Sequence, residues 1–207
     1  MKRRSILSLI GVSPFALIPS RDAEKNVLIN DLKVRWAKSK EYTLAVFDAM
    51  PAEHIEFSPT ENQLTFAQHF IHLSFFNVLF MGLMTDKEEF TDFESLMQKD
   101  YLIPPPDDID IFKVGHLKKQ SDDLNKKRVT DYITETFDDV IATLSQIDDE
   151  VLYQGKEKPK PGFLAGHTNL DLILRGENHT AHHRAQAIVY LRLMNVEPPG
   201  YGQYNIL

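Results

Sequence analysis

The sequence predicts an all-α protein, a four-helix bundle with one long crossover between its second and third helices. Four long segments carry apolar residues at helical spacing, and none shows the alternating pattern that is typical of a β-strand. The chain has 207 residues, of which 43% are hydrophobic. It can therefore form one sizeable core without requiring a second domain.

The first two helices are expected over residues 22–49 and 65–84, where apolar residues recur at helical spacing. Two prolines and a run without apolar periodicity separate them, and proline disfavours helix continuation. Thr65 is followed three residues later by Gln68. This spacing fits a capping box, in which each of the two side chains accepts a backbone N–H of the other residue. The second helix is therefore expected to start at Thr65.

The long crossover is expected over residues 85–121, which contain three successive prolines at 104–106 and many acidic residues. A third helix is expected over residues 124–147, with its apolar residues in one stripe. The stretch GKEKPKPGF that follows is typical of a loop. Residues 167–169 then offer capping side chains for a fourth helix that reaches Met194.

Residues 1–21 are expected to be an export signal rather than part of the fold. Basic residues at positions 2–4 precede a mostly apolar stretch over residues 6–18, which is the layout of a secretory signal. The adjacent arginines resemble a twin-arginine signal, and this resemblance implies a periplasmic protein. A cytoplasmic protein with an N-terminal helix or tail is the alternative. The apolar stretch is shorter than the roughly 20 residues of a stable membrane span.

Composition excludes several classes of function. The chain has 23 Lys and Arg against 30 Asp and Glu, a formal net charge of −7. Residues 1–21 hold four basic residues and no acidic one, so the rest has a formal charge of −11. No nucleic-acid partner is expected, because phosphate binding needs clustered basic side chains. Cysteine is absent, so disulfides and thiolate ligands are excluded, and a bound metal requires nitrogen and oxygen ligands.

Histidines carry the strongest functional signal. His179 and His183 are four residues apart, so both imidazoles lie on one face of the fourth helix. His69 and His72 are both expected to point into the core from the second helix. Three imidazoles with an open fourth position are typical of a catalytic zinc site. Spacing alone leaves open which histidine is the third ligand, and a His-x-x-x-His pair also occurs on solvated helices.

Neighbouring residues support weaker expectations. Gly176, one turn before His179, is expected to leave space for a substrate or water. His182 is expected to point sideways to another helix or solvent. No serine or carboxylate is placed as a nucleophile or base, because Glu177 lies on a different helix face from His179. Catalytic residues other than metal ligands are therefore not assigned.

Two motifs resemble those of the DinB/YfiT superfamily. The stretch TFAQHFIHLSFFN, residues 65–77, is similar to the family's second-helix motif, and ENHTAHHRAQAIVYLRLMNVEPPG, residues 177–200, resembles its last-helix signature. The resemblance covers residues 22–207 and implies that His72, His179 and His183 bind a divalent metal ion, zinc or nickel. It further implies an up-down-down-up bundle that forms a homodimer.

The resemblance also implies a function. Some members of the family are metal-dependent thiol transferases, so the expected activity is metal-dependent transfer to a small thiol, or hydrolysis of a small molecule. The alternatives are a non-catalytic metal-binding protein and a purely structural helical dimer. Arg184 and Gln186 match the family motif and are expected to serve packing or hydrogen bonding near the ligands.

Overall fold

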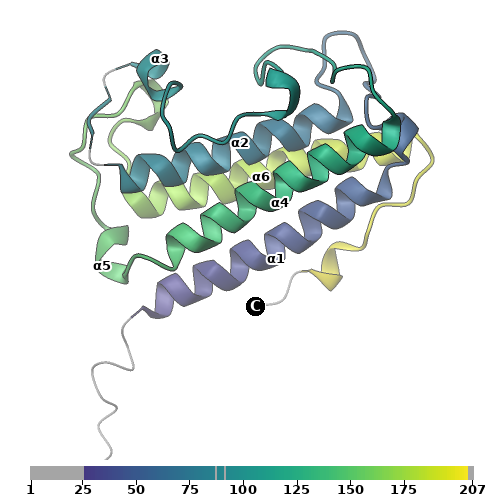
Figure 1. The fold of residues 1–207 in the computed structure, drawn as a ribbon. Coiled ribbons are helices and arrows are strands. Elements are labelled where there is room, and N and C mark those ends of the chain that lie inside the picture. The colour runs from purple at the N-terminus through teal and green to yellow at the C-terminus, as the bar shows by residue number, and fades with distance from the viewer. Residues whose placement is uncertain (1–25, 87, 91, 205–207) are drawn as a thin grey trace, which may run out of the picture.

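The computed structural model describes residues 26–86, 88–90 and 92–204. The predicted export signal at residues 1–21 lies outside this part of the chain. The described residues form helices and no strand, so the prediction of an all-α protein is confirmed. These helices are four long ones and two of a single turn, and Figure 1 shows their arrangement. They are α1 (Val27–Ala49), α2 (Phe66–Thr85), α3 (Phe93–Leu96), α4 (Asp122–Leu144), α5 (Asp149–Leu152) and α6 (Asn169–Leu193).

The four long helices lie side by side around one core. Helix α2 packs against α4 and α6, and α1 packs against the same two helices. Following the chain through Figure 1, α1 and α6 run in one direction and α2 and α4 in the other. Short 3-10 turns lie in three of the connections and after α6. They are η1 (Ala52–His54), η2 (Pro106–Asp108), η3 (Gly162–Leu164) and η4 (Tyr201–Gln203).

Both predicted capping sites set the start of a helix. Thr65 accepts a hydrogen bond from the backbone N–H of Gln68 at 3.2 Å, and the Gln68 side chain accepts from the Thr65 N–H at 3.2 Å. The capping box predicted from their spacing is therefore confirmed. Thr168 and Asp171 form a second capping box at the start of α6. These caps determine where α2 and α6 begin, and so which of their residues face each other.

Helix α2 is the central element of the core. Nearly every side chain of α2 is buried, because α4, α6 and the crossover cover it on different sides. Within the described part of the chain, α2 is the one helix long and apolar enough to cross a membrane, with a mean hydropathy of 1.3. However, 94% of the apolar stretch is buried inside the protein, as expected of a core helix.

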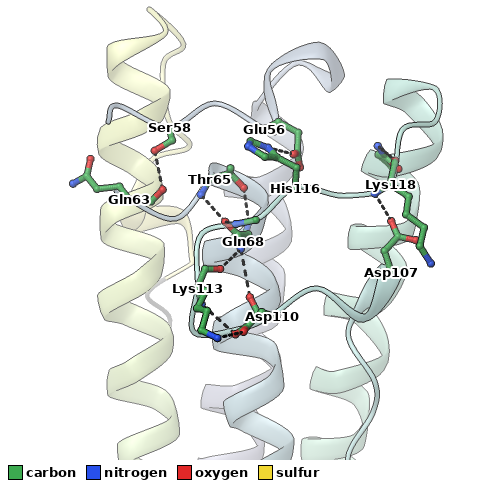
Figure 2. A network of polar contacts seen from close by, with 12 residues as sticks. Glu56, Ser58, Gln63, Thr65, Gln68, Asp107, Asp110, Lys113, His116 and Lys118 are labelled. Carbon is green, nitrogen blue, oxygen red and sulfur yellow. Dashed lines mark hydrogen bonds and ion pairs between the residues drawn. The ribbon is translucent and has the colours of Figure 1, made fainter. Parts of the chain in front are cut away.

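The crossover between α2 and α4 folds back along α2 rather than forming a solvated loop (Figure 1). Its buried apolar side chains are Phe90, Leu96, Ile109, Ile111 and Leu117. Figure 2 shows how Gln68 attaches it to α2. The Gln68 side chain donates to the Lys113 carbonyl at 2.9 Å and accepts from the Gly115 N–H at 3.2 Å. The crossover is therefore held against the first turns of α2.

Candidate metal centre

Three histidines from two helices meet between α2 and α6. Helix α2 supplies His72, and α6 supplies His179 and His183 one turn apart. The Nε2 atom of His179 lies 3.2 Å from Nε2 of His72 and 3.1 Å from Nε2 of His183. One ring nitrogen from each residue lies within 4.8 Å of the other two. The structure therefore brings together the three histidines that the family resemblance selected.

The surroundings keep these imidazoles neutral at pH 7. Burial, together with the neighbouring imidazoles, lowers the pKa of His179 to about 4 and that of His183 to about 2. Burial also lowers the pKa of His72, although its hydrogen bond to a backbone carbonyl acts in the opposite direction. Neutral imidazole is the form that binds a metal ion. All three rings are therefore in the protonation state that coordination requires.

The crossover determines which nitrogen of His72 faces the cluster. The Nδ1 atom of His72 lies 2.6 Å from the Ile111 carbonyl oxygen, which can only accept a hydrogen bond. The proton of the neutral ring is therefore on Nδ1, and Nε2 presents a lone pair to His179. Asp110 supports this arrangement, because its side chain accepts the Phe112 N–H at 2.8 Å and shapes the turn around Ile111.

A buried chain of hydrogen bonds orients His183 in the same way. The Tyr190 hydroxyl donates to the Leu64 carbonyl at 3.2 Å, so it accepts from Nε2 of His69, also at 3.2 Å. The Nδ1 atom of His69 is then unprotonated and accepts from Nδ1 of His183 at 2.9 Å. The proton of the His183 ring is therefore on Nδ1. Its Nε2 lone pair points at the cluster.

This donor set fits a divalent cation. Nε2 of His179 faces both neighbouring Nε2 atoms, and Nδ1 of His179 is buried without a hydrogen-bond partner among the described residues. A single proton on His179 can satisfy only one of the two facing lone pairs. A tetrahedral zinc ion with bonds of about 2.0–2.1 Å needs ligand nitrogens about 3.3–3.4 Å apart. The Nε2 distances of 3.1 and 3.2 Å from His179 are close to that spacing, and the three ligand nitrogens all lie within 4.8 Å of one another.

The other histidines near the cluster have different positions. His69 is only 3% exposed and lies behind His183, as the chain of hydrogen bonds requires. His182 is exposed, and its Nε2 lies 2.6 Å from the side-chain nitrogen of Gln186. His182 is therefore on the solvent side of α6, as its sequence position predicted, and its ring centre lies 5.0 Å from that of His183. Gln186, which matches the family motif, contacts His182 and makes no hydrogen bond to the cluster within the described chain.

Arg184 connects α6 to α1 instead of contacting the cluster. Its guanidinium donates to the Ser39 side chain at 3.1 Å and to the Thr43 hydroxyl at 3.0 Å, and it lies 4.5 Å from the centre of the Tyr42 ring. The residue therefore serves the packing of the two helices, which was one of the roles expected from the motif.

The expectation for Gly176 was wrong. A Cβ atom at this position would lie 3.2 Å from the Trp36 ring, so the indole occupies the space that was expected to hold a substrate or water. A larger residue here would press on the Trp36 ring, because α1 and α6 approach closely around this large buried side chain. Glu177 next to it accepts from Nε of Arg35 at 3.1 Å. Glu177 therefore faces α1. This agrees with the prediction that it lies on a different helix face from His179.

A cavity of about 500 Å³ lies beside His179. It is lined by Phe76, Phe80, Phe163, Arg175, Asn178 and His179. Sequence reasoning missed Arg175 and Phe163 as residues of the site. Arg175 was detectable, because it precedes His179 by four residues and therefore shares its helix face. Phe163 had no local signal, because it lies on η3 and only the path of the preceding loop places it there.

The hydrogen bonds behind His183 lead to a prediction. His69→Ala is expected to weaken zinc binding about tenfold, because outer partners that orient a ligand typically contribute 10–100-fold to metal affinity. Tyr190→Phe, which removes only the hydroxyl, is expected to weaken it less. Competition titration against a zinc-binding dye measures both effects. His116→Ala is the control, since this exposed histidine pairs with Glu56 elsewhere on the surface. Unchanged affinity in both variants would show that His183 is not oriented through His69.

The fold and the cluster define an all-helical protein with three histidines gathered between two helices. The sequence profile of the DinB superfamily matches residues 35–187. This protein therefore belongs to the DinB superfamily. Its fold is similar to that of a DinB-like protein, YjoA, from Bacillus subtilis, with a TM-score of 0.56 and 17% identity over 83% of this chain and 98% of the other. A search of curated protein sequences finds no match.

Proposed function

We propose that the protein binds one divalent metal ion, zinc or nickel, through His72, His179 and His183 and leaves one coordination position open. The observation that carries this proposal is the convergence of three neutral imidazoles. In His72 and His183 the ring proton is donated from Nδ1 to an acceptor outside the cluster, which leaves Nε2 free to bind the ion. Imidazole is a ligand that suits both ions. Three protein ligands with one open position are typical of catalytic rather than structural sites.

The activity proposed is metal-dependent transfer to a small thiol, or hydrolysis of a small molecule. A bound divalent ion lowers the pKa of a coordinated water or thiol, which supplies a nucleophile at neutral pH. Among the cavity-lining residues, none is a carboxylate or a serine that could act as nucleophile or base. The contribution of the chain is therefore to hold the imidazoles in one tautomer and to offer an aromatic cavity beside His179.

Counting metal in the untagged full-length protein tests the proposal. We expect about one equivalent of zinc or nickel per chain by elemental analysis after dialysis, and turnover in a screen that pairs small thiols with electrophiles and includes simple esters. Bound metal without turnover in any of these reactions would favour a non-catalytic metal-binding protein. Protein that retains no metal after incubation with either ion would contradict the proposal and leave a structural helical protein.

Three further proposals concern the setting of the site. We infer that the four long helices form the up-down-down-up bundle of the superfamily, and that two copies associate as a homodimer. We also propose that residues 1–21 direct export through a twin-arginine pathway. Light scattering tests the dimer. N-terminal sequencing of protein recovered from the periplasm tests the signal, and an intact Met1 in cytoplasmic protein would contradict it.

A further inference from the structure

The walls of the cavity beside His179 are mainly aromatic. Phe76 and Phe80 come from α2, and Phe163 comes from η3. The Phe76 ring lies 4.9 Å from the His179 ring, centre to centre, in an edge-to-face arrangement. A molecule in this cavity therefore contacts aromatic rings and an imidazole of the cluster. Its volume of about 500 Å³ is within the range typical of small-molecule sites.

The aromatic surface continues outside the cavity. The Phe163 ring lies 6.5 Å from that of Phe93, which lies 5.9 Å from that of Phe112, and Phe112 lies 6.2 Å from the His72 ring. Phe112 and Phe163 are each 55% exposed. Large exposed aromatic side chains that gather beside a cavity favour a ligand with an apolar, planar part.

Among the described residues, Arg175 is the one charged residue in the lining of this cavity, and its charge is positive. The lining includes no Asp or Glu, although acidic residues outnumber basic ones in the chain. The other lining residues are phenylalanines, the neutral amide of Asn178 and the neutral imidazole of His179. Within the described ranges the guanidinium of Arg175 has no ion pair or hydrogen bond, unlike that of Arg35, which pairs with Glu177. An anionic group entering the cavity meets an uncompensated cation, whereas a cationic group meets no counter-charge.

We propose that this cavity binds a small molecule with an aromatic or planar apolar body and a carboxylate, the body against the rings of Phe163 and Phe76 and the carboxylate on Arg175. A guanidinium binds a carboxylate through two parallel hydrogen bonds, which gives orientation as well as affinity. The assignment rests on the proposed function, because it makes this molecule the substrate presented to the ion at His179. It narrows the substrate class from any small molecule to aromatic carboxylates.

The test compares two probes that differ in charge, 3-phenylpropanoate and 3-phenylpropan-1-ol. Isothermal titration calorimetry measures their binding to the full-length protein, both metal-free and with one equivalent of zinc. The wild type is expected to prefer the carboxylate about tenfold, the size of one charge-assisted contact. Arg175→Gln is expected to remove this preference without changing the affinity for the alcohol. Phe163→Ala is expected to weaken the binding of both probes by the same factor.

Arg192→Gln is the matched control, since this exposed arginine lies on the same helix but outside the cavity. Equal binding of the two probes to the wild type would overturn the inference, and so would no detectable binding of either. A carboxylate preference that survives Arg175→Gln would also overturn it, because the carboxylate would then contact something else. If that surviving preference also disappeared with zinc removal, the carboxylate would be binding the ion itself.

Counting zinc in the same samples separates this inference from the proposed function. Stoichiometric zinc in wild type and in Arg175→Gln, with no effect of Arg175 on the probes, would contradict the inference alone. A preference that depends on Arg175 in protein unable to retain zinc would contradict the metal centre alone. Stoichiometric zinc in both proteins, together with a preference lost in Arg175→Gln, supports both.

Discussion

Replacing His183 with alanine is expected to lower zinc affinity at least about a hundredfold, whereas the same change at His182 is expected to leave it unchanged. The two histidines are adjacent on α6, but His183 is buried with its Nε2 3.1 Å from that of His179, while His182 is exposed beside Gln186. The loss of a ligand should exceed the 10–100-fold effect of an outer partner. Competition titration with a zinc-binding dye measures both variants.

His179→Ala provides a second test of the ligand set at a half-buried position, where truncation disturbs the core less than at His183. Circular dichroism of each variant establishes that the helices are intact before affinities are compared. If His182→Ala lost zinc as severely as His183→Ala, the ion would lie on the solvent side of α6, and the assignment of the inner cluster would be wrong.

The metal-free protein is expected to lose stability as the pH falls from 7 to 5. Burial lowers the pKa of His69 to about 4, below the value near 6.5 expected in the unfolded chain. The unfolded state therefore binds the additional proton first, and the free energy of unfolding falls as pH drops through 6.5 toward 4. For His69 alone the loss at pH 5 is about 2 kcal/mol. His179 and His183 shift in the same direction and add to it.

Urea denaturation at the two pH values measures this loss as a lower midpoint at pH 5. The side chain of His69→Gln cannot titrate. The urea midpoint of this variant is therefore expected to fall less between pH 7 and pH 5 than that of the wild type. Carboxylates whose pKa is lowered, such as those of Asp107 and Asp110, lose their stabilising contribution only below about pH 4. The interval from pH 5 to 7 therefore reports mainly on histidines. Equal urea midpoints at the two pH values would contradict the prediction. They would show that water solvates these histidines, so that burial does not lower their pKa values.

Much of the helical framework was predictable because its signals are local. Thr65 with Gln68 marked the start of α2, and residues 167–169, of which Thr168 is the cap, marked the start of α6, because a cap acts within one helical turn. The short helix α5 was not predicted, since Asp149–Leu152 contributes too few residues to show a period. The crossover was predicted from its prolines. Its close packing on α2 was not, because the contacts join residues far apart in the sequence.

The candidate site was predictable to a similar extent. Family resemblance selected His72, although spacing alone left His69 and His72 equivalent on α2. The structure distinguishes them by their hydrogen bonds. His69 is bonded to Tyr190 and His183, whereas His72 is bonded to the Ile111 carbonyl. Neither contact has a signature in the sequence around the histidines. The misjudged role of Gly176 has the same origin, since its neighbour Trp36 is 140 residues earlier in the chain.

By itself, the sequence determined that the protein is helical, where α2 and α6 begin, and that His179 and His183 share a face. These properties follow from a 3.6-residue period and from caps that act over three or four residues. Only the tertiary structure decided which nitrogen of each imidazole faces the cluster, what fills the space beside Gly176, and that Arg175 and Phe163 line one cavity. Those features depend on which helices and loops pack together, and packing is decided by the whole chain.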